Sequence, residues 1–241
     1  MSILRFQGRS PSQPRAIKIT PKYLKNPIGS VLVEYGETKV LCSATVEETV
    51  PNWMRGTRGQ GWITAEYALL PASTLDRTKR ERQYLSGRTQ EIQRLIGRSL
   101  RSIVDLKQLG ERTIIIDCDV LHADGGTRTA AITGGYVALK LAIEALIKQN
   151  KIRNNNNPLK DAVAAISLGV FEDQIFVDLD YQEDLKADVD LNVVMTATGQ
   201  LLEVQGTAEK RPFTREQLNK MLDLASDALK EVFDEQNAAF A

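Results

Sequence analysis

The chain has 241 residues, enough for one large domain or two small ones, and its 31 acidic and 31 basic side chains give no formal net charge. That balance argues against a protein that coats nucleic acid through bulk charge, and 42% hydrophobic with 26% charged residues is ordinary for a soluble globular chain. No apolar run approaches the ~20 residues of a membrane span, and the polar segment Met1–Pro14 has no signal-like apolar core, so we expect a cytoplasmic protein with a partly flexible start and no membrane partner.

The first part of the chain is rich in strand patterns. Ala16–Thr20 alternates apolar and basic residues, and the strand-like runs Ser30–Tyr35 and Lys39–Val46 flank a predicted hairpin turn at Gly36–Thr38. A long polar stretch with many glycines and arginines, Pro51–Gly87, follows. Because long irregular stretches in compact domains are usually functional or disordered, we expect an irregular loop there.

Two helices are predicted next, separated by a strand. Glu91–Leu106 carries apolar residues at helical spacing, Thr113–Leu121 is a β-branched strand, and Thr129–Lys148 is a second helix. The run Asn154–Pro158 then indicates a loop and a domain boundary.

The second part of the chain again combines strand and helix patterns, with fewer insertions between them. Ala162–Val170 with Gln174–Asp180, and Asp190–Thr196 with Leu201–Gly206, predict two hairpins, and Thr214–Phe233 predicts a closing helix. Two mixed halves, each with hairpins and packed helices, indicate the α+β class. We therefore expect domains at residues 1–150 and 151–241.

Cysteine and histidine are scarce. Cys42 and Cys118 sit in apolar, strand-like runs and are interpreted as buried free thiols. With His122 as the single histidine, a structural zinc site lacks ligands, and nothing near it resembles a nucleophile elbow.

Charge is distributed unevenly along the chain. Arg55–Arg112 holds twelve Lys and Arg against six Asp and Glu, whereas Phe171–Asp190 holds one Lys against eight acidic residues. A polyanion could bind the first region and a metal the second, or the two could be solvated faces that neutralise each other. Composition alone leaves both readings open.

The segment Asp124–Arg128 lies between a predicted strand and a predicted helix. Glycines such as Gly126 let the backbone approach a ligand closely, and the first amides of the helix are unpaired donors that favour anions. Thr127 adds a hydroxyl and Arg128 a guanidinium suited to phosphate. The segment is thus a candidate phosphate site or a plain strand-to-helix turn, and it is neither a Walker A loop nor a Rossmann fingerprint.

Two other basic features precede or open helices. Arg88, in Ser86–Thr89, would lie near a helix start and could hold a second small oxyanion, or be merely exposed. The basic loop with Arg77 and Arg80 suits phosphate-backbone contacts, or could simply aid solubility.

Acidic residues crowd the end of one predicted strand and the start of the next: Asp178, Asp180, Asp184, Asp188 and Asp190. Their mutual repulsion is costly unless cations or basic groups relieve it. Carboxylate oxygens suit Mg²⁺, although a solvated loop would explain the same pattern.

Taken together, these blocks resemble the ribonuclease PH family from about Arg15 to the last helix. The blocks that carry the resemblance are Gly29–Gly36, Thr38–Cys42, Gly59–Tyr67, Gly87–Ile96, Asp117–Val120, Ala123–Ala130, Asp190–Met195 and Glu203–Glu209.

The resemblance implies a phosphorolytic exoribonuclease that trims the 3′ end of tRNA precursors and releases nucleoside diphosphates. It implies that Arg88 and the Gly126–Arg128 segment hold the attacking phosphate, the co-substrate. It further implies that Asp184 and Asp190 serve catalysis and the divalent cation, Mg²⁺.

For the rest of the molecule, the resemblance implies two related βαβα-type halves with mixed sheets. It also implies RNA contacts at Arg77 and Arg80, and a homohexamer built as a trimer of dimers.

Two alternatives remain at this stage. A non-catalytic ring subunit of the same fold would lack parts of the phosphate and acidic sets, all of which are present here. A plain RNA-binding module would carry the acidic cluster for structural reasons only.

Overall fold

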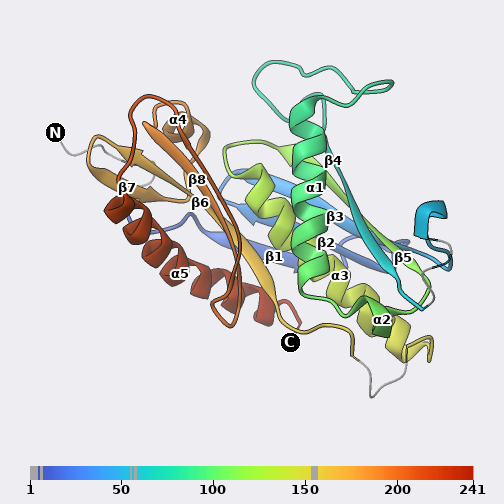
Figure 1. The fold of residues 1–241 in the computed structure, drawn as a ribbon. Helices are drawn as coiled ribbons and strands as arrows, with labels where there is room; N and C mark the ends of the chain where they lie inside the picture. The colour runs from blue at the N-terminus through green and yellow to red at the C-terminus, as the bar shows by residue number, and fades with distance from the viewer. Residues whose placement is uncertain (1–4, 6–7, 55, 57–58, 153–156, 241) are drawn as a thin grey trace.

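The computed structural model describes residues 5, 8–54, 56, 59–152 and 157–240. The chain forms two β-sheets with helices packed between and beside them (Figure 1). The first sheet has the order β1-β2-β3-β5-β4, and its strands are β1 (Ile17–Pro21), β2 (Gly29–Tyr35), β3 (Thr38–Glu47), β4 (Trp62–Leu69) and β5 (Thr113–His122). Its pairings are antiparallel except for β4 with β5, which is parallel.

The second sheet is antiparallel, with the order β7-β6-β8-β9. Its strands are β6 (Val163–Phe171), β7 (Gln174–Val177), β8 (Val189–Thr196) and β9 (Leu201–Ala208). The helices are α1 (Gly87–Ser102), α2 (Leu106–Leu109), α3 (Thr127–Lys148), α4 (Tyr181–Asp184) and α5 (Arg215–Ala238). The α+β class predicted from the sequence is confirmed.

Strand β4 corrects the expectation of irregular chain over Pro51–Gly87. The sequence of β4 buries Ile63, Ala65 and Tyr67 at alternate positions, which is the period of a strand with one face on the core. Its neighbour β5 supplies the backbone partners along its whole length. The strand was not predicted because the glycines and arginines on either side of it are typical of loops.

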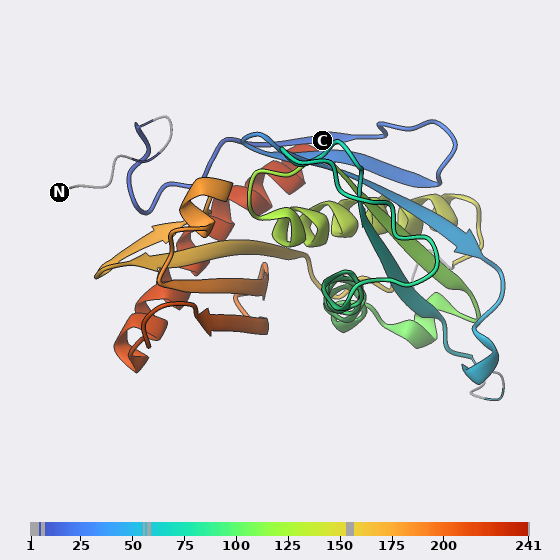
Figure 2. The same ribbon diagram turned by 90° about the horizontal axis from the view of Figure 1, so that it is seen from above.

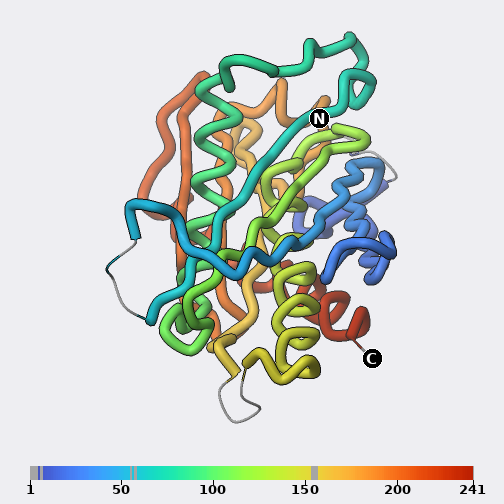
Figure 3. The backbone as a smooth tube through the Cα atoms, turned by 90° about the vertical axis from the view of Figure 1, so that its right-hand side faces the viewer, coloured from blue at the N-terminus to red at the C-terminus, as the bar shows by residue number. Residues whose placement is uncertain are grey.

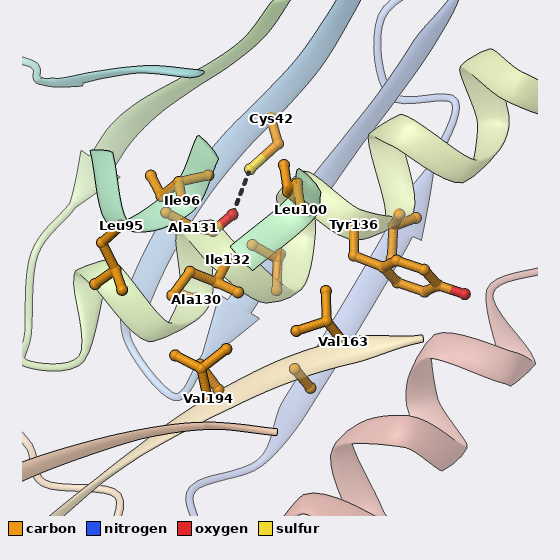
Figure 4. Close-up of a cluster of buried hydrophobic side chains, with 14 of the residues drawn as sticks. Cys42, Leu95, Ile96, Leu100, Ala130, Ala131, Ile132, Tyr136, Val163 and Val194 are labelled. Atoms are coloured by element: carbon orange, nitrogen blue, oxygen red, sulfur yellow. Dashed lines mark hydrogen bonds between the residues drawn. The ribbon is translucent and has the colours of Figure 1, made fainter. Parts of the chain in front are cut away.

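Helix α3 is the centre of the molecule. It packs against β2 and β3 of the first sheet, against β6 of the second sheet, and beside α1 (Figures 1 and 4). By length and composition it could cross a membrane, but most of its surface is buried by the surrounding elements. Figure 4 shows the thiol of Cys42 near the carbonyl oxygen of Ala131, at 3.8 Å. Cys42 and Cys118 are both buried and free, as predicted.

Helix α5 packs against β6, β7 and β8 and also contacts β1 of the first sheet. Thr214 and Gln217 form the reciprocal capping box at its start, with hydrogen bonds of 3.1 and 2.8 Å. In Figure 2, the helix lies along the second sheet while the N-terminal segment passes near α4.

Part of the N-terminal segment packs against the second half of the chain, and the expected partly flexible start stays a prediction. Residues 1–4 and 6–7 lie outside the described residues, but the side chains of Arg5, Arg9 and Arg15 are buried. The backbone of Val177 donates a 2.8 Å hydrogen bond to the carbonyl of Pro11. Carboxylates more than a hundred residues away neutralise these arginines, a pairing that local composition does not reveal.

The predicted boundary loop Asn154–Pro158 falls largely outside the described residues, since 154–156 are not described. Just beyond it, Leu159 forms an isolated antiparallel bridge with Val104.

Candidate phosphate and catalytic site

The turn between β5 and α3 is left-handed at two successive glycines. Gly125 and Gly126 have φ of 74° and 65°, a region that L side chains rarely adopt. A Cβ on Gly125 would also lie 2.5 Å from the carbonyl oxygen of Leu179, in the other half of the chain. Both backbone shape and close approach therefore require glycine at position 125.

Gly126 is the N-cap of α3 and, having no side chain, does not cap it. The first-turn amides of a 22-residue helix thus start at the turn without a side-chain acceptor. Those amides and the helix dipole favour an anion at this point.

Thr127, the first residue of α3, is oriented by strand β4. The phenol of Tyr67 donates a 2.8 Å hydrogen bond to Thr127 Oγ1, and both side chains are buried. Burial raises the pKa of Tyr67, so the phenol remains a neutral donor.

Arg128 is held by two side chains from other elements. Its Nη1 donates to Gln205 Oε1 of β9 at 2.5 Å and lies 3.5 Å from Glu91 Oε2 of α1. Gln205 in turn donates to Glu91 Oε1 at 2.8 Å. This closed arrangement fixes the guanidinium, and neither Glu91 nor Gln205 was singled out from the sequence, although both lie in blocks that carried the resemblance.

Arg88 is the second residue of α1, as its position before a helix predicted. Ser86 caps the helix by accepting from the backbone amide of Thr89 at 3.2 Å. The Arg88 side chain is exposed and lines the same cavity as Arg128. Two guanidinium groups, each near the start of a helix, thus line the same cavity.

Asp184 and Asp190 face these arginines from the second half of the chain. Burial, followed by the charge of Asp184, raises the pKa of Asp190 to about 6. Burial also raises the pKa of Asp184, while the charges of Arg88 and Arg128 oppose that rise. The two carboxylates are close enough to repel each other, as expected for groups that share a cation or a proton.

The other three acidic residues of the predicted cluster have separate roles. Asp178 pairs with Arg15 at 2.7 Å, and Asp180 caps α4 by accepting from the amide of Glu183 at 2.8 Å. Asp188 pairs with Arg211 at 2.6 Å. Only two of the five aspartates therefore line the cavity.

The cavity has a volume of about 540 Å³ and gathers six of the predicted site residues, a size typical of small-ligand sites. These six are Arg88, Gly126, Thr127, Arg128, Asp184 and Asp190. Arg77 and Arg80 are exposed and do not line it, but their loop does through Thr74, Leu75, Asp76 and Thr78. The loop arches over one end of the molecule between β4 and α1 (Figure 3).

Another cavity, of about 570 Å³, lies between the N-terminal segment and α5 and contains none of the predicted site residues. Its lining combines Arg9 and Arg15 with Glu231, Asp234 and Glu235 of α5. Without the threonine, the glycine turn and the pair of facing carboxylates, it does not match the chemistry predicted from the sequence.

The carboxylates of the cavity bear on whether a metal ion could bind there. Within the described residues, no group of three or more His, Cys, Asp or Glu side chains could hold an ion. Mg²⁺, however, usually takes one or two carboxylates, waters and substrate phosphates, and Asp184 with Asp190 fits that requirement.

Family models match most of the chain. The description "3′ exoribonuclease family, domain 1" matches residues 13–143, and "3′ exoribonuclease family, domain 2" matches residues 161–228.

Curated relatives are similar over nearly their whole length. Ribonuclease PH of Crocosphaera subtropica is 57% identical over 241 residues, covering 100% of this chain and 99% of the relative. Ribonuclease PH of Moorella thermoacetica is 59% identical, covering 95% of this chain and 91% of the relative. That of Bacillus cereus is 55% identical, with 98% and 96% covered.

Solved structures share the fold at low identity. The crystal structure of rice Rrp46 superposes with a TM-score of 0.78 at 19% identity, covering 97% of this chain and 99% of that chain. A chain of the Archaeoglobus fulgidus exosome with RNA bound to the active site gives 0.78 at 18% identity, with 96% and 92% covered.

Proposed function

The chain belongs to the ribonuclease PH family of 3′ exoribonucleases, and we propose on that basis that it trims the 3′ end of tRNA precursors by phosphorolysis. It is a phosphorolytic exoribonuclease and nucleotidyltransferase, with inorganic phosphate as co-substrate. Its proposed phosphate ligands are Arg88, Gly126, Thr127 and Arg128.

One observation carries the assignment of the site. Two arginines, a buried threonine hydroxyl and a helix start border the same cavity as two carboxylates with raised pKa values. Phosphoryl transfer depends on positioning and charge neutralisation, and this set supplies both. It needs neither a histidine nor a cysteine.

The reaction follows from these positions. An oxygen of inorganic phosphate attacks the phosphorus of the last phosphodiester, and the bond from that phosphorus to the 3′ oxygen of the preceding nucleotide breaks. The products are a nucleoside 5′-diphosphate and an RNA one nucleotide shorter with a free 3′ hydroxyl. Arg88 and Arg128 neutralise the attacking phosphate, and the Thr127 hydroxyl and helix amides orient it.

Asp184 and Asp190 are the proposed catalytic pair and the proposed Mg²⁺ ligands. When bound there, the cation would offset negative charge on the scissile phosphate and the leaving oxygen. Asp184 and Asp190 would hold this positive charge on the side of the cavity that faces the arginines.

Arg77 and Arg80 are the proposed RNA contacts. Both are exposed on the loop whose other residues border the cavity, so an RNA strand leaving the site would pass near them. The remaining proposals are a cytoplasmic homohexamer, built as a trimer of dimers, and a domain division between residues 150 and 151.

The non-catalytic ring subunit is the weaker alternative. A chain that only bound RNA would have no use for a phosphate turn facing two carboxylates with raised pKa values. The full set of Arg88, Thr127, Arg128, Asp184 and Asp190 supports the enzyme.

A nucleotide-release assay tests the proposal. The protein is incubated with a 3′-extended tRNA and Mg²⁺, with and without inorganic phosphate, and the products are separated by chromatography. Nucleoside diphosphates should form only when phosphate is present. Release of monophosphates, or of no nucleotide, would contradict phosphorolysis.

A further inference from the structure

We infer that Arg15 and Asp178 form a buried positioning pair that holds the phosphate turn in register with the acidic side of the site, an inference that rests on the proposed function. Neither residue lines the site as a predicted ligand, and they lie 163 positions apart in the chain. The pair connects the start of the first half with the junction between β7 and α4.

Arg15 binds both carboxylate oxygens of Asp178. Arg15 Nε donates to Asp178 Oδ2 at 2.8 Å, Nη2 donates to Oδ1 at 2.7 Å, and the backbone amide of Arg15 donates to Oδ2 at 2.8 Å. The side chains are 2% and 0% exposed. Such a fork-to-fork pair has one geometry, unlike a contact through a single flexible charge.

The remaining donors of Arg15 reach the phosphate turn itself. Nη1 donates to the backbone carbonyl of Asp124 at 2.5 Å, and Nη2 to that of Gly125 at 3.5 Å. A Cβ on Gly126 would lie 3.0 Å from Nη2, so the guanidinium packs directly against the N-cap of α3. The same group therefore binds Asp178 and fixes Asp124 and Gly125, the two residues before the N-cap.

Backbone hydrogen bonds fix the position of Asp178 in the second half of the chain. It adopts a left-handed φ of 55°, rare for a residue with a side chain. Its amide donates to the carbonyl of Ser167 in β6 at 2.7 Å, and its own carbonyl accepts from Arg5 Nη2 at 3.0 Å. Asp184 follows six residues later at the end of α4.

The pair thus sets the position of the attacking phosphate relative to the catalytic carboxylates. A displacement of about 1 Å at a reacting centre can cost ~100-fold in rate. The hydrogen bonds to the two carbonyls of the turn link this ion pair to the phosphate side of the site.

Two conservative variants separate positioning from stability. Asp178→Asn keeps the shape and tolerates left-handed backbone, and Arg15→Lys keeps the charge opposite Asp178 but cannot also reach the turn. Arg98→Ala is the control, because the more exposed Arg98–Glu203 pair also joins the two halves but does not touch the turn. Folding of each protein is confirmed by its thermal midpoint.

The readouts are kcat and the separate KM values for phosphate and for RNA. In both variants kcat should fall and the KM for phosphate should rise about tenfold or more, equivalent to ~1.4 kcal/mol or more, while the KM for RNA changes little. Arg98→Ala should leave both KM values as in the wild type.

Folded variants with a wild-type KM for phosphate would overturn the inference. So would failure of both variants to fold while Arg98→Ala folds, because the pair would then serve the fold alone. A wild-type protein that releases no nucleoside diphosphate would instead contradict the proposed function, which separates the two failures.

Discussion

The phenol of Tyr67 in β4, an edge strand of the first sheet, donates a 2.8 Å hydrogen bond to Oγ1 of Thr127, the first residue of α3. Since the threonine oxygen accepts from Tyr67, the threonine's own proton is left to donate elsewhere. The cavity lies beside it, so the hydroxyl can donate to an anion there.

Tyr67→Phe should therefore weaken phosphate binding without unfolding the protein. Loss of one neutral hydrogen bond is worth roughly 0.5–1.5 kcal/mol, so we expect the KM for phosphate to rise roughly 2- to 12-fold. Steady-state kinetics at varied phosphate measure this, with Tyr23→Phe at an exposed position as control. An unchanged KM would mean that Thr127 does not contact phosphate.

Arg88→Ala and Arg128→Ala should each abolish measurable phosphorolysis at limiting phosphate while the fold persists. Arg88 is exposed, so its removal leaves no buried carboxylate unpaired. Each lost charge-assisted contact is worth about 1.5–3 kcal/mol in binding alone. Nucleotide release and thermal midpoints measure the two effects, and wild-type release by either variant would remove that arginine from the phosphate site.

Activity should fall as the pH decreases through about 6, because Asp190 has a pKa raised to about 6 and acts as a carboxylate. Protonation would weaken cation binding and remove the negative charge opposite the arginines. NMR of carboxyl-labelled aspartate should show a titration near pH 6 in the wild type and none there in Asp190→Asn. The prediction fails if every aspartate titrates below about pH 5.

Asp190→Asn should stabilise the metal-free protein while stopping turnover. A raised carboxyl pKa adds stability that is fully present below the unfolded pKa of about 4 and is lost as the pH rises through the folded pKa. The substitution therefore gains ~1–3 kcal/mol at about pH 8 and less at about pH 5. Urea denaturation at the two pH values tests the sign, and a destabilised variant at the higher value would contradict it.

Arg5→Ala should destabilise the protein through the buried carboxylate it leaves behind. Arg5 binds Glu183 with two hydrogen bonds of 2.8 and 2.9 Å, and both side chains are buried. A buried charge left wholly unpaired costs roughly 3–5 kcal/mol, and we expect a smaller loss because Arg9 still lies 3.4 Å from Glu183. Lys18→Ala, at an exposed partner of Glu34, should cost only ~0–1 kcal/mol. Equal urea midpoints for the two variants, at one protein concentration, would rule out the stabilising role of Arg5.

The turn before α3 could be predicted from the sequence because its information is local. Gly125 and Gly126 fix the turn, and Thr127 and Arg128 follow directly at the start of the helix. The closing helix and most strands were likewise found within a few residues, since periodicity and capping are short-range signals. Strand β4 was missed because its flanks resemble loop sequence more strongly than its core resembles a strand.

The roles of the acidic residues could not be separated from sequence alone. Five aspartates within a short segment look alike in the sequence. They differ in their partners, which come from distant parts of the chain. Asp178 pairs with Arg15 and Asp188 pairs with Arg211, whereas half-buried Asp190 has no cation in hydrogen-bond contact among the described residues. The same limit hid the partner of Arg5, because Glu183 binds it from 178 positions away.

The long separation of Arg15 from Asp178 also bears on how the protein is made. Synthesis delivers the N-terminus first, so Arg15 and the glycine turn leave the ribosome well before β7 exists. Until Asp178 is translated, the Arg15 guanidinium has only the more distant carboxylate of Asp124, at 3.9 Å, and the proposed catalytic aspartates have not been made. The proposed site is therefore complete only once the second sheet has formed against the first.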